Sequence, residues 1–154
     1  NPIIDLTGLS GLTLEGNIST ASETGGLSYL GFYKIENANG AVKDPVTGNL
    51  ILPGSADYRL AATDASNLFD PFGTYSTYSN TTKSITSLTD TPMLGVYANK
   101  DSTDAFFSFA EANTDGMHHF REFGNGTIGY EDQWGGGDND FDDYIFGIDL
   151  KLTV

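Results

Sequence analysis

The clearest pattern in the chain is the alternation of apolar and polar residues over its last eleven positions. One face of this segment would carry six apolar side chains, those of Tyr144, Phe146, Ile148, Leu150, Leu152 and Val154. The other face would carry Gly147, Asp149, Lys151 and Thr153. Because successive side chains of a β-strand point to opposite faces, this period of two predicts a long strand with one buried face.

Shorter apolar runs, separated by Gly, Asn, Asp and Ser, predict more strands at 27–35, 93–98, 105–110 and 118–123. The turn-forming residues Asn39-Gly40 and Thr47-Gly48-Asn49 indicate closely spaced turns around 41–52. The polar stretch 74–90 is typical of a long surface loop or a weak edge strand.

One segment, 56–67, has the spacing of a helix, because it follows Pro53-Gly54-Ser55 and offers Leu60, Ala61, Ala65 and Leu68 for a single face. Many short strands with one short helix predict an all-β fold, more specifically a β-sandwich of jelly-roll type.

Length and charge narrow the class of protein. The 154 residues fit a single domain spanning 1–154, and the start without Met leads us to expect a module excised from a larger protein. Seven basic against 21 acidic residues give a net charge of −14, which repels nucleic acid and anionic membrane surfaces and favours cations as partners. No apolar run approaches the ~20 residues that cross a bilayer, so we expect no membrane insertion.

The strongest anomaly is the segment 131–143, which we call the acidic segment. Six of its thirteen residues are acids, where an even distribution would place about two: Glu131, Asp132, Asp138, Asp140, Asp142 and Asp143. Two carboxylates ~4 Å apart repel by roughly 4 kcal/mol at an effective dielectric constant of ~20. Because Ca²⁺ accepts six to eight oxygens from carboxylates, Asn amides and carbonyls, it is the ion that fits this composition best.

The spacing agrees with calcium but not with an EF-hand. Asp138, Asp140 and Asp142 repeat every two residues, yet the sixth position holds Asp143 where an EF-hand needs Gly, and no helix flanks the segment. The three glycines before Asp138 would let the backbone bend Glu131 and Asp132 towards the same ion. A solvated acidic face remains the alternative.

The stretch from Tyr130 to Asp143 resembles the terminal signature of a bacterial family known as domain of unknown function 4114. Weaker likeness lies at 30–34, 53–58 and 107–113. The resemblance implies an extracellular or cell-surface, Ca²⁺-loaded β-sandwich of the kind found in secreted proteins and RTX-type adhesins. It points to Glu131, Asp132, Asp138, Asp140 and Asp143 as metal-site residues, with Asn139 and Asp142 as adjacent contributors.

Other candidate sites are less specific. Gly124 to Gly129 has the form G-x-G-x-x-G, but a strand-like Tyr130 follows where a nucleotide site needs a helix, so we predict a hairpin turn. His118 and His119 are adjacent and would point to opposite faces of a strand, and no G-x-S-x-G motif accompanies them. Carboxylate pairs could serve a glycosidase, but the metal interpretation accounts for them better, and we expect no enzyme.

These observations lead to two functional hypotheses. In the first, Ca²⁺ organises a loop site that captures a carbohydrate or a peptide on a host or neighbouring cell surface, the module being monomeric within a long chain. The ligand would contact Trp134, Tyr130, Asp115 or His118, where Asp115 lies in a predicted turn and the aromatic residues offer a stacking wall. In the second, the ion only rigidifies the domain and no ligand is bound.

Overall fold

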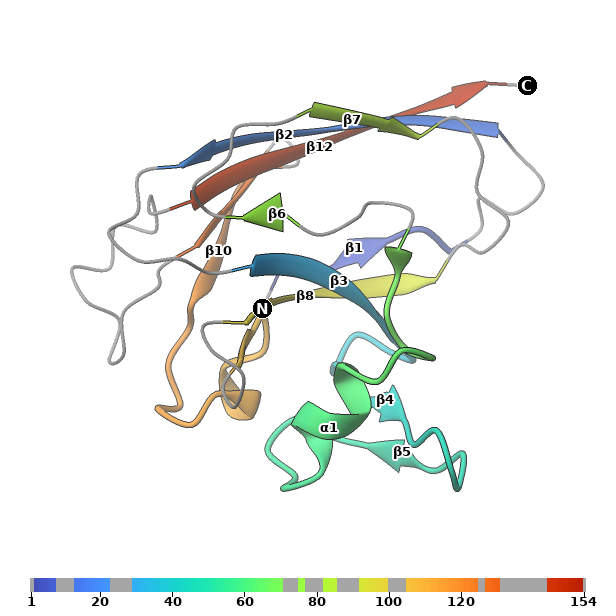
Figure 1. Cartoon of the computed structure of the whole chain (residues 1–154), viewed down its shortest axis with the longest axis vertical. Helices are drawn as coiled ribbons and strands as arrows, with labels where there is room; N and C mark the ends of the chain where they lie inside the picture. The colour runs from blue at the N-terminus through green and yellow to red at the C-terminus, as the bar shows by residue number, and fades with distance from the viewer. Residues whose placement is uncertain are drawn as a thin grey trace.

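The computed structural model describes residues 2–7, 13–22, 29–70, 75–76, 82–85, 92–99, 105–124, 127–130 and 144–153. This described part is mostly β, with one short α-helix and small antiparallel sheets. Figure 1 shows β2, β7 and β12 along one side, β3 and β8 in the middle, and α1 with β4 and β5 on the other side.

The first sheet has, in the described residues, the strand order β1-β8-β3-β6, with β9 paired to β8. Its strands are β1 (Ile4–Asp5), β3 (Tyr29–Ile35), β6 (Tyr75–Ser76), β8 (Met93–Asn99) and β9 (Ala105–Phe107). The central pair, β3 and β8, is antiparallel over all seven residues of each strand. Both of its faces are covered, because Leu30 and Phe32 belong to one hydrophobic cluster whereas Tyr33 and Ile35 belong to another.

The second sheet runs β10-β11-β12-β2-β7 in the described chain. Its strands are β2 (Thr13–Ser22), β7 (Thr82–Ile85), β10 (Phe120–Gly124), β11 (Thr127–Tyr130) and β12 (Tyr144–Thr153). Three of its side chains, those of Phe120, Ile128 and Tyr130, join the cluster that contains Leu30 and Phe32. The two sheets therefore share one hydrophobic core.

The opposite face of the first sheet is covered by β4 (Val42–Lys43), β5 (Leu50–Ile51) and α1 (Tyr58–Ala62). Its second hydrophobic cluster is built around edge-to-face contacts of Tyr33, Tyr58 and Phe107. The Tyr58 hydroxyl donates to the Gly40 carbonyl at 2.6 Å and lies 3.0 Å from the Tyr33 hydroxyl. Both buried hydroxyls thus have partners, as burial requires.

Two glycines of the central pair make room for the rings of Tyr33 and Tyr97. Gly95 is the ladder partner of Tyr33, and Gly31 is the partner of Tyr97. A Cβ on Gly95 would lie 2.5 Å from the Tyr33 ring, and one on Gly31 would lie 2.6 Å from the Tyr97 hydroxyl. Each ring therefore occupies the space that any larger residue opposite it would need.

Several predicted elements are confirmed, and others have different bounds. The strands predicted at 27–35, 93–98, 118–123 and 144–154 match β3, β8, β10 and β12 within a few residues. The predicted hairpin at the G-x-G-x-x-G stretch agrees with the antiparallel pairing of β10 and β11, whose connecting residues 125–126 lie outside the described part. The strand predicted at 105–110 ends at Phe107, and a 3₁₀ turn, η2, follows at Ala110–Ala112. β2 was not predicted. Short strands β6 and β7 at the sheet edges fall within 74–90, whose other residues lie outside the described part.

The helix predicted at 56–67 is limited to Tyr58–Ala62. The Asn67 side chain donates to the Ala61 carbonyl at 2.8 Å, and Asp64 accepts a bond from the Ser66 amide at 2.9 Å. These local bonds compete with further helical bonds, which is why Asp and Asn favour helix ends. The sandwich and jelly-roll arrangement remains a prediction.

The buried tyrosines predict a loss of stability in alkali. Burial raises the pKa of Tyr33 and of Tyr58, whereas an unfolded tyrosine ionises near pH ~10. Above that pH the unfolded state releases protons that the folded state keeps, so the free energy of unfolding should fall as pH rises. We expect a decrease of up to about 1.4 kcal/mol per pH unit for each tyrosine, measured by urea unfolding across this range.

Tyr58→Phe should reduce this alkaline slope, and Tyr29→Phe, which changes a tyrosine 49% exposed at the start of β3, should leave it as in the wild type. An equal slope in all three proteins would contradict the assignment of the effect to the buried pair.

Candidate functional site

Four strands of the second sheet begin or end at a single row. Phe120, Tyr130, Tyr144 and Ser22 are successive ladder partners across β10, β11, β12 and β2. β10 and β12 start at this row, and β11 and β2 finish there. We call this edge the loop end of the second sheet, because the chain enters or leaves the sheet here in all four strands.

The acidic segment is attached to the loop end by both of its termini. It starts directly after Tyr130 and finishes directly before Tyr144, and these two residues are antiparallel partners. Partners in such a ladder have Cα atoms about 4.5–5.5 Å apart. The thirteen residues that hold six acids therefore connect two positions that are adjacent in the sheet. All seven predicted metal-site residues lie outside the described part, as does Trp134: Glu131, Asp132, Asp138, Asn139, Asp140, Asp142 and Asp143.

The loop that leads into β10 is shaped by the side chain of Asn113. Its Nδ2 donates to the carbonyls of Phe107 at 3.1 Å and Met117 at 2.8 Å, and its Oδ1 accepts from the Phe107 amide at 2.7 Å. Gly116 takes a φ of 67°, which glycine adopts at little cost. The loop is thus tied to the end of β9 by a residue that is itself buried.

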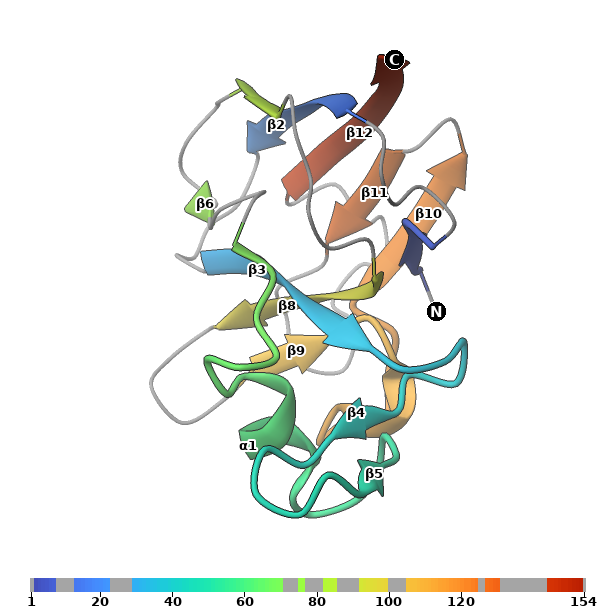
Figure 2. The same ribbon diagram turned by 90° about the vertical axis from the view of Figure 1, so that its right-hand side faces the viewer.

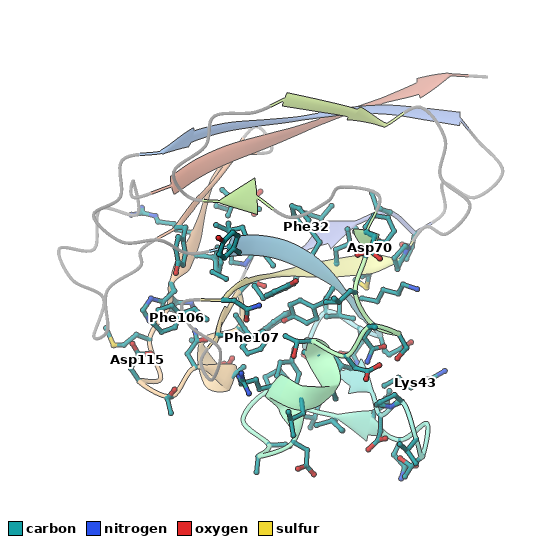
Figure 3. All side chains as sticks on the ribbon, viewed as in Figure 1. Phe32, Lys43, Asp70, Phe106, Phe107 and Asp115 are labelled. Carbon is teal, nitrogen blue, oxygen red and sulfur yellow. The ribbon has the colours of Figure 1, made fainter. Side chains whose placement is uncertain are left out.

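Within this loop, Asp115 and His119 form a close pair. His119 Nε2 lies 2.7 Å from Asp115 Oδ2, and the other carboxylate oxygen accepts from the Met117 amide at 3.0 Å. The His119 ring is fully buried and stacks on Phe106 with a centroid distance of 3.6 Å and an interplanar angle of 9°. Figure 3 shows Asp115 next to Phe106 at the rim of the molecule. His119 therefore fixes the orientation of a carboxylate whose side chain is 13% exposed.

The structure separates the two adjacent histidines as the sequence predicts. His118 is exposed and His119 is buried, although both precede the first residue of β10. The partner of Asp115 is His119, whereas the residue that we predicted for ligand binding is His118. The spacing of four residues between Asp115 and His119 is a signal that the sequence contained, but only the turn at Gly116 brings the pair together.

Tyr130 lies at the loop end but inside the core. Its side chain is fully buried, and its ring is 4.9 Å from that of Phe120. It packs both sheets together and presents no exposed face on which a ligand could stack. Of the four predicted ligand-binding residues, Asp115 and His118 thus lie in the loop before β10. Tyr130 lies in the hydrophobic core, and Trp134 lies outside the described part.

Within the described ranges, no group of three or more His, Asp or Glu side chains is placed to hold a metal ion. Among the same residues, no helix has the length and apolar character needed to span a bilayer.

A comparison with protein families shows the family to which the chain belongs. The model of the family described as Domain of unknown function (DUF4114) matches residues 71–151, more than half of the chain. The protein therefore belongs to this family, which confirms the resemblance noted from the sequence. The match includes β6 to β11, most of β12 and the acidic segment, and 107–113 falls within it, whereas 30–34 and 53–58 lie upstream. No curated protein and no solved structure gives a significant match.

We predict that Asn113→Ala destabilises the protein by at least about 3 kcal/mol. The substitution leaves the Phe107 amide and two carbonyls without their present partner, and each buried group left unpaired costs about 1–3 kcal/mol. Chemical denaturation measures the change, with Asn39→Ala at an exposed turn position as the matched control. A loss no larger than that of the control would show that these bonds do not hold the loop.

Proposed function

We propose that the chain is a Ca²⁺-dependent ligand-binding module of an extracellular bacterial surface protein, and that the acidic segment holds the ion. The observation that carries this proposal is the closure of the acidic segment by the pairing of Tyr130 with Tyr144. A sequence rich in acids could otherwise extend into solvent and relieve its own repulsion. Here folding brings both ends of the segment together.

The charge balance at the loop end supports a bound cation. Between Arg121 and Lys151 the chain contains no basic residue. In the backbone register of β12 and β2, Lys151 is opposite Glu15, seven residues along β12 from Tyr144. Arg121 follows Phe120 directly, so it is the basic residue whose strand position is nearest to the loop end. One positive charge does not balance six carboxylates, whereas a divalent ion with oxygen ligands reduces their repulsion directly. Extracellular calcium modules work at high ambient Ca²⁺, which is consistent with a surface location.

A ligand would bind beside this ion at the loop end. A carbohydrate can offer vicinal hydroxyls and a peptide can offer a carboxylate, and either would complete a coordination shell left open by the protein. The exposed His118 and the oriented Asp115 lie in the loop that precedes β10, next to the row where the acidic segment starts. No catalytic activity is part of the proposal.

The shared core supports a finer proposal about architecture. We infer that the two five-stranded sheets pack face to face as a β-sandwich, because Leu30 and Phe32 of one sheet cluster with Phe120, Ile128 and Tyr130 of the other. A jelly-roll connection of the strands is the form that we propose for it.

Calcium should stabilise the protein through the acidic segment. Ca²⁺ at a hundredfold excess over Kd would add about 2.7 kcal/mol to the free energy of unfolding. We expect Tm to rise with Ca²⁺ and to fall back with a chelator in the wild type. Asp138→Ala and Asp140→Ala should abolish this response, whereas Asp90→Ala, which removes an acid outside the segment, should keep it. Equal responses in the three variants would place the ion elsewhere.

Ligand capture separates the proposal from a purely structural role of the ion. We expect the protein to bind a subset of a glycan array or of a peptide panel in Ca²⁺ and to release it in chelator. Asp138→Ala should lose the same binding. A Tm response to Ca²⁺ with no chelator-sensitive ligand in either panel would instead support the second hypothesis, in which the ion only rigidifies the domain.

A further inference from the structure

A hollow of about 350 Å³ lies between the β4–β5 hairpin and α1. Figure 2 shows these three elements together at one end of the molecule, away from β12 and β2. The residues that line the hollow are Asp44, Pro45, Ile51, Asp57, Leu60, Ala61 and Asp64. Ala61 belongs to the second hydrophobic cluster and Ile51 packs against it, so the floor of the hollow is supported by the core.

The rim of this hollow exposes apolar surface. Leu60 is 68% exposed, although its neighbours Ala61 and Ala62 in α1 are buried. Val46, in the turn that follows Pro45, is 91% exposed. Single exposed aliphatic residues are common on protein surfaces. Here, however, Leu60 borders a hollow whose floor is also apolar. Leu60 and this floor together form a surface that an apolar side chain could cover.

The same hollow is lined by three carboxylates and by no basic residue among its described lining. Asp44 Oδ1 accepts from the amides of Val46 at 2.8 Å and Thr47 at 3.1 Å, and Asp64 Oδ2 accepts from the Ser66 amide at 2.9 Å. These turns hold the two carboxylates in place. Lys43, labelled in Figure 3, precedes Asp44 and pairs with Leu50 in the hairpin ladder.

The three carboxylates do not converge on a point. Among the described residues no acidic group of this size is placed to hold a metal ion, and apolar side chains of Ile51, Leu60 and Ala61 share the hollow with them. A bare ion would leave that apolar surface in water. An occupant that matches both features has an apolar body and positive charge, which lysine and arginine side chains flanked by an aliphatic residue provide.

We propose that this hollow is a docking site for a basic amphipathic peptide segment of a partner protein. An aliphatic side chain of the segment covers Ile51, Leu60 and Ala61, and its lysine or arginine head groups face Asp44, Asp57 and Asp64. The net charge of −14 attracts such a segment from a distance, while the local arrangement selects where it binds. The site uses none of the acidic segment and does not depend on calcium.

The test uses a fluorescein-labelled peptide of alternating lysine and leucine, with fluorescence anisotropy as the readout. We expect saturable binding that weakens with salt and is the same with Ca²⁺ or chelator. Asp44→Asn/Asp57→Asn/Asp64→Asn should weaken binding about tenfold, and Leu60→Ser should have a similar effect because it removes apolar contact. The asparagines keep a side-chain oxygen for the turn bonds, and melting curves check the fold.

The matched control is Glu36→Gln/Glu111→Gln/Glu122→Gln, which removes the same number of charges at exposed positions elsewhere. It should change affinity less than about twofold. No binding of the lysine–leucine peptide, equal losses in the two triple variants, or equal binding of a lysine–serine peptide would each overturn the proposal. A dimer seen in sedimentation and abolished by Leu60→Ser would also overturn it, because the occupant would then be a second copy.

Discussion

The candidate site depends on one backbone constraint, the antiparallel pairing of Tyr130 with Tyr144. Each strand of this pair also has a second neighbour, so the acidic segment begins and ends in the interior of a sheet and not at a loose edge. Tyr130 is itself fully buried between the sheets. Moving the ends of the segment apart would therefore break both ladder bonds and core packing. The repulsion among the carboxylates has to be relieved with the ends in place.

Buried contacts elsewhere in the described fold support the loop end of the second sheet. The first sheet is covered on both faces, and its central strands accommodate the rings of Tyr33 and Tyr97 by placing a glycine opposite each of these two. Beside the row, Asn113 ties the preceding loop to β9, and His119 stacks on Phe106 while it holds Asp115. The loop before β10 is thus organised by buried side chains, and it contributes an oriented carboxylate next to the origin of the acidic segment.

The sequence predicted those features that depend on local pattern. The alternation of apolar and polar residues predicted β12. Continuous apolar runs predicted β3 and β8, because both faces of β3 and of β8 are buried. It missed β2, in which Leu14 and Ile18 are the only large apolar residues, since that strand owes its place to pairing with β12. Helix α1 ends early because Asn67 and Asp64 take up bonds that lie outside any helical periodicity.

For the site, the sequence predicted a cluster of acids, but not the pair at its side. The Asp115–His119 contact requires the positive φ of Gly116 and the three bonds of Asn113, neither of which a spacing rule contains. The burial of Tyr130 was equally hidden, because an aromatic residue beside charges looks the same in sequence whether it faces a ligand or the core. Long-range packing decides between these outcomes.

The most direct test of the central claim uses the single tryptophan of the chain, Trp134, which lies within the acidic segment. Terbium is a luminescent substitute for Ca²⁺, and excitation at the red edge of tryptophan absorption reports only an ion bound close to Trp134. If the acidic segment binds Ca²⁺, terbium should give sensitised emission that Ca²⁺ displaces and that Trp134→Phe removes. Absence of this emission in the wild type, or emission that excess Ca²⁺ leaves unchanged, would contradict it.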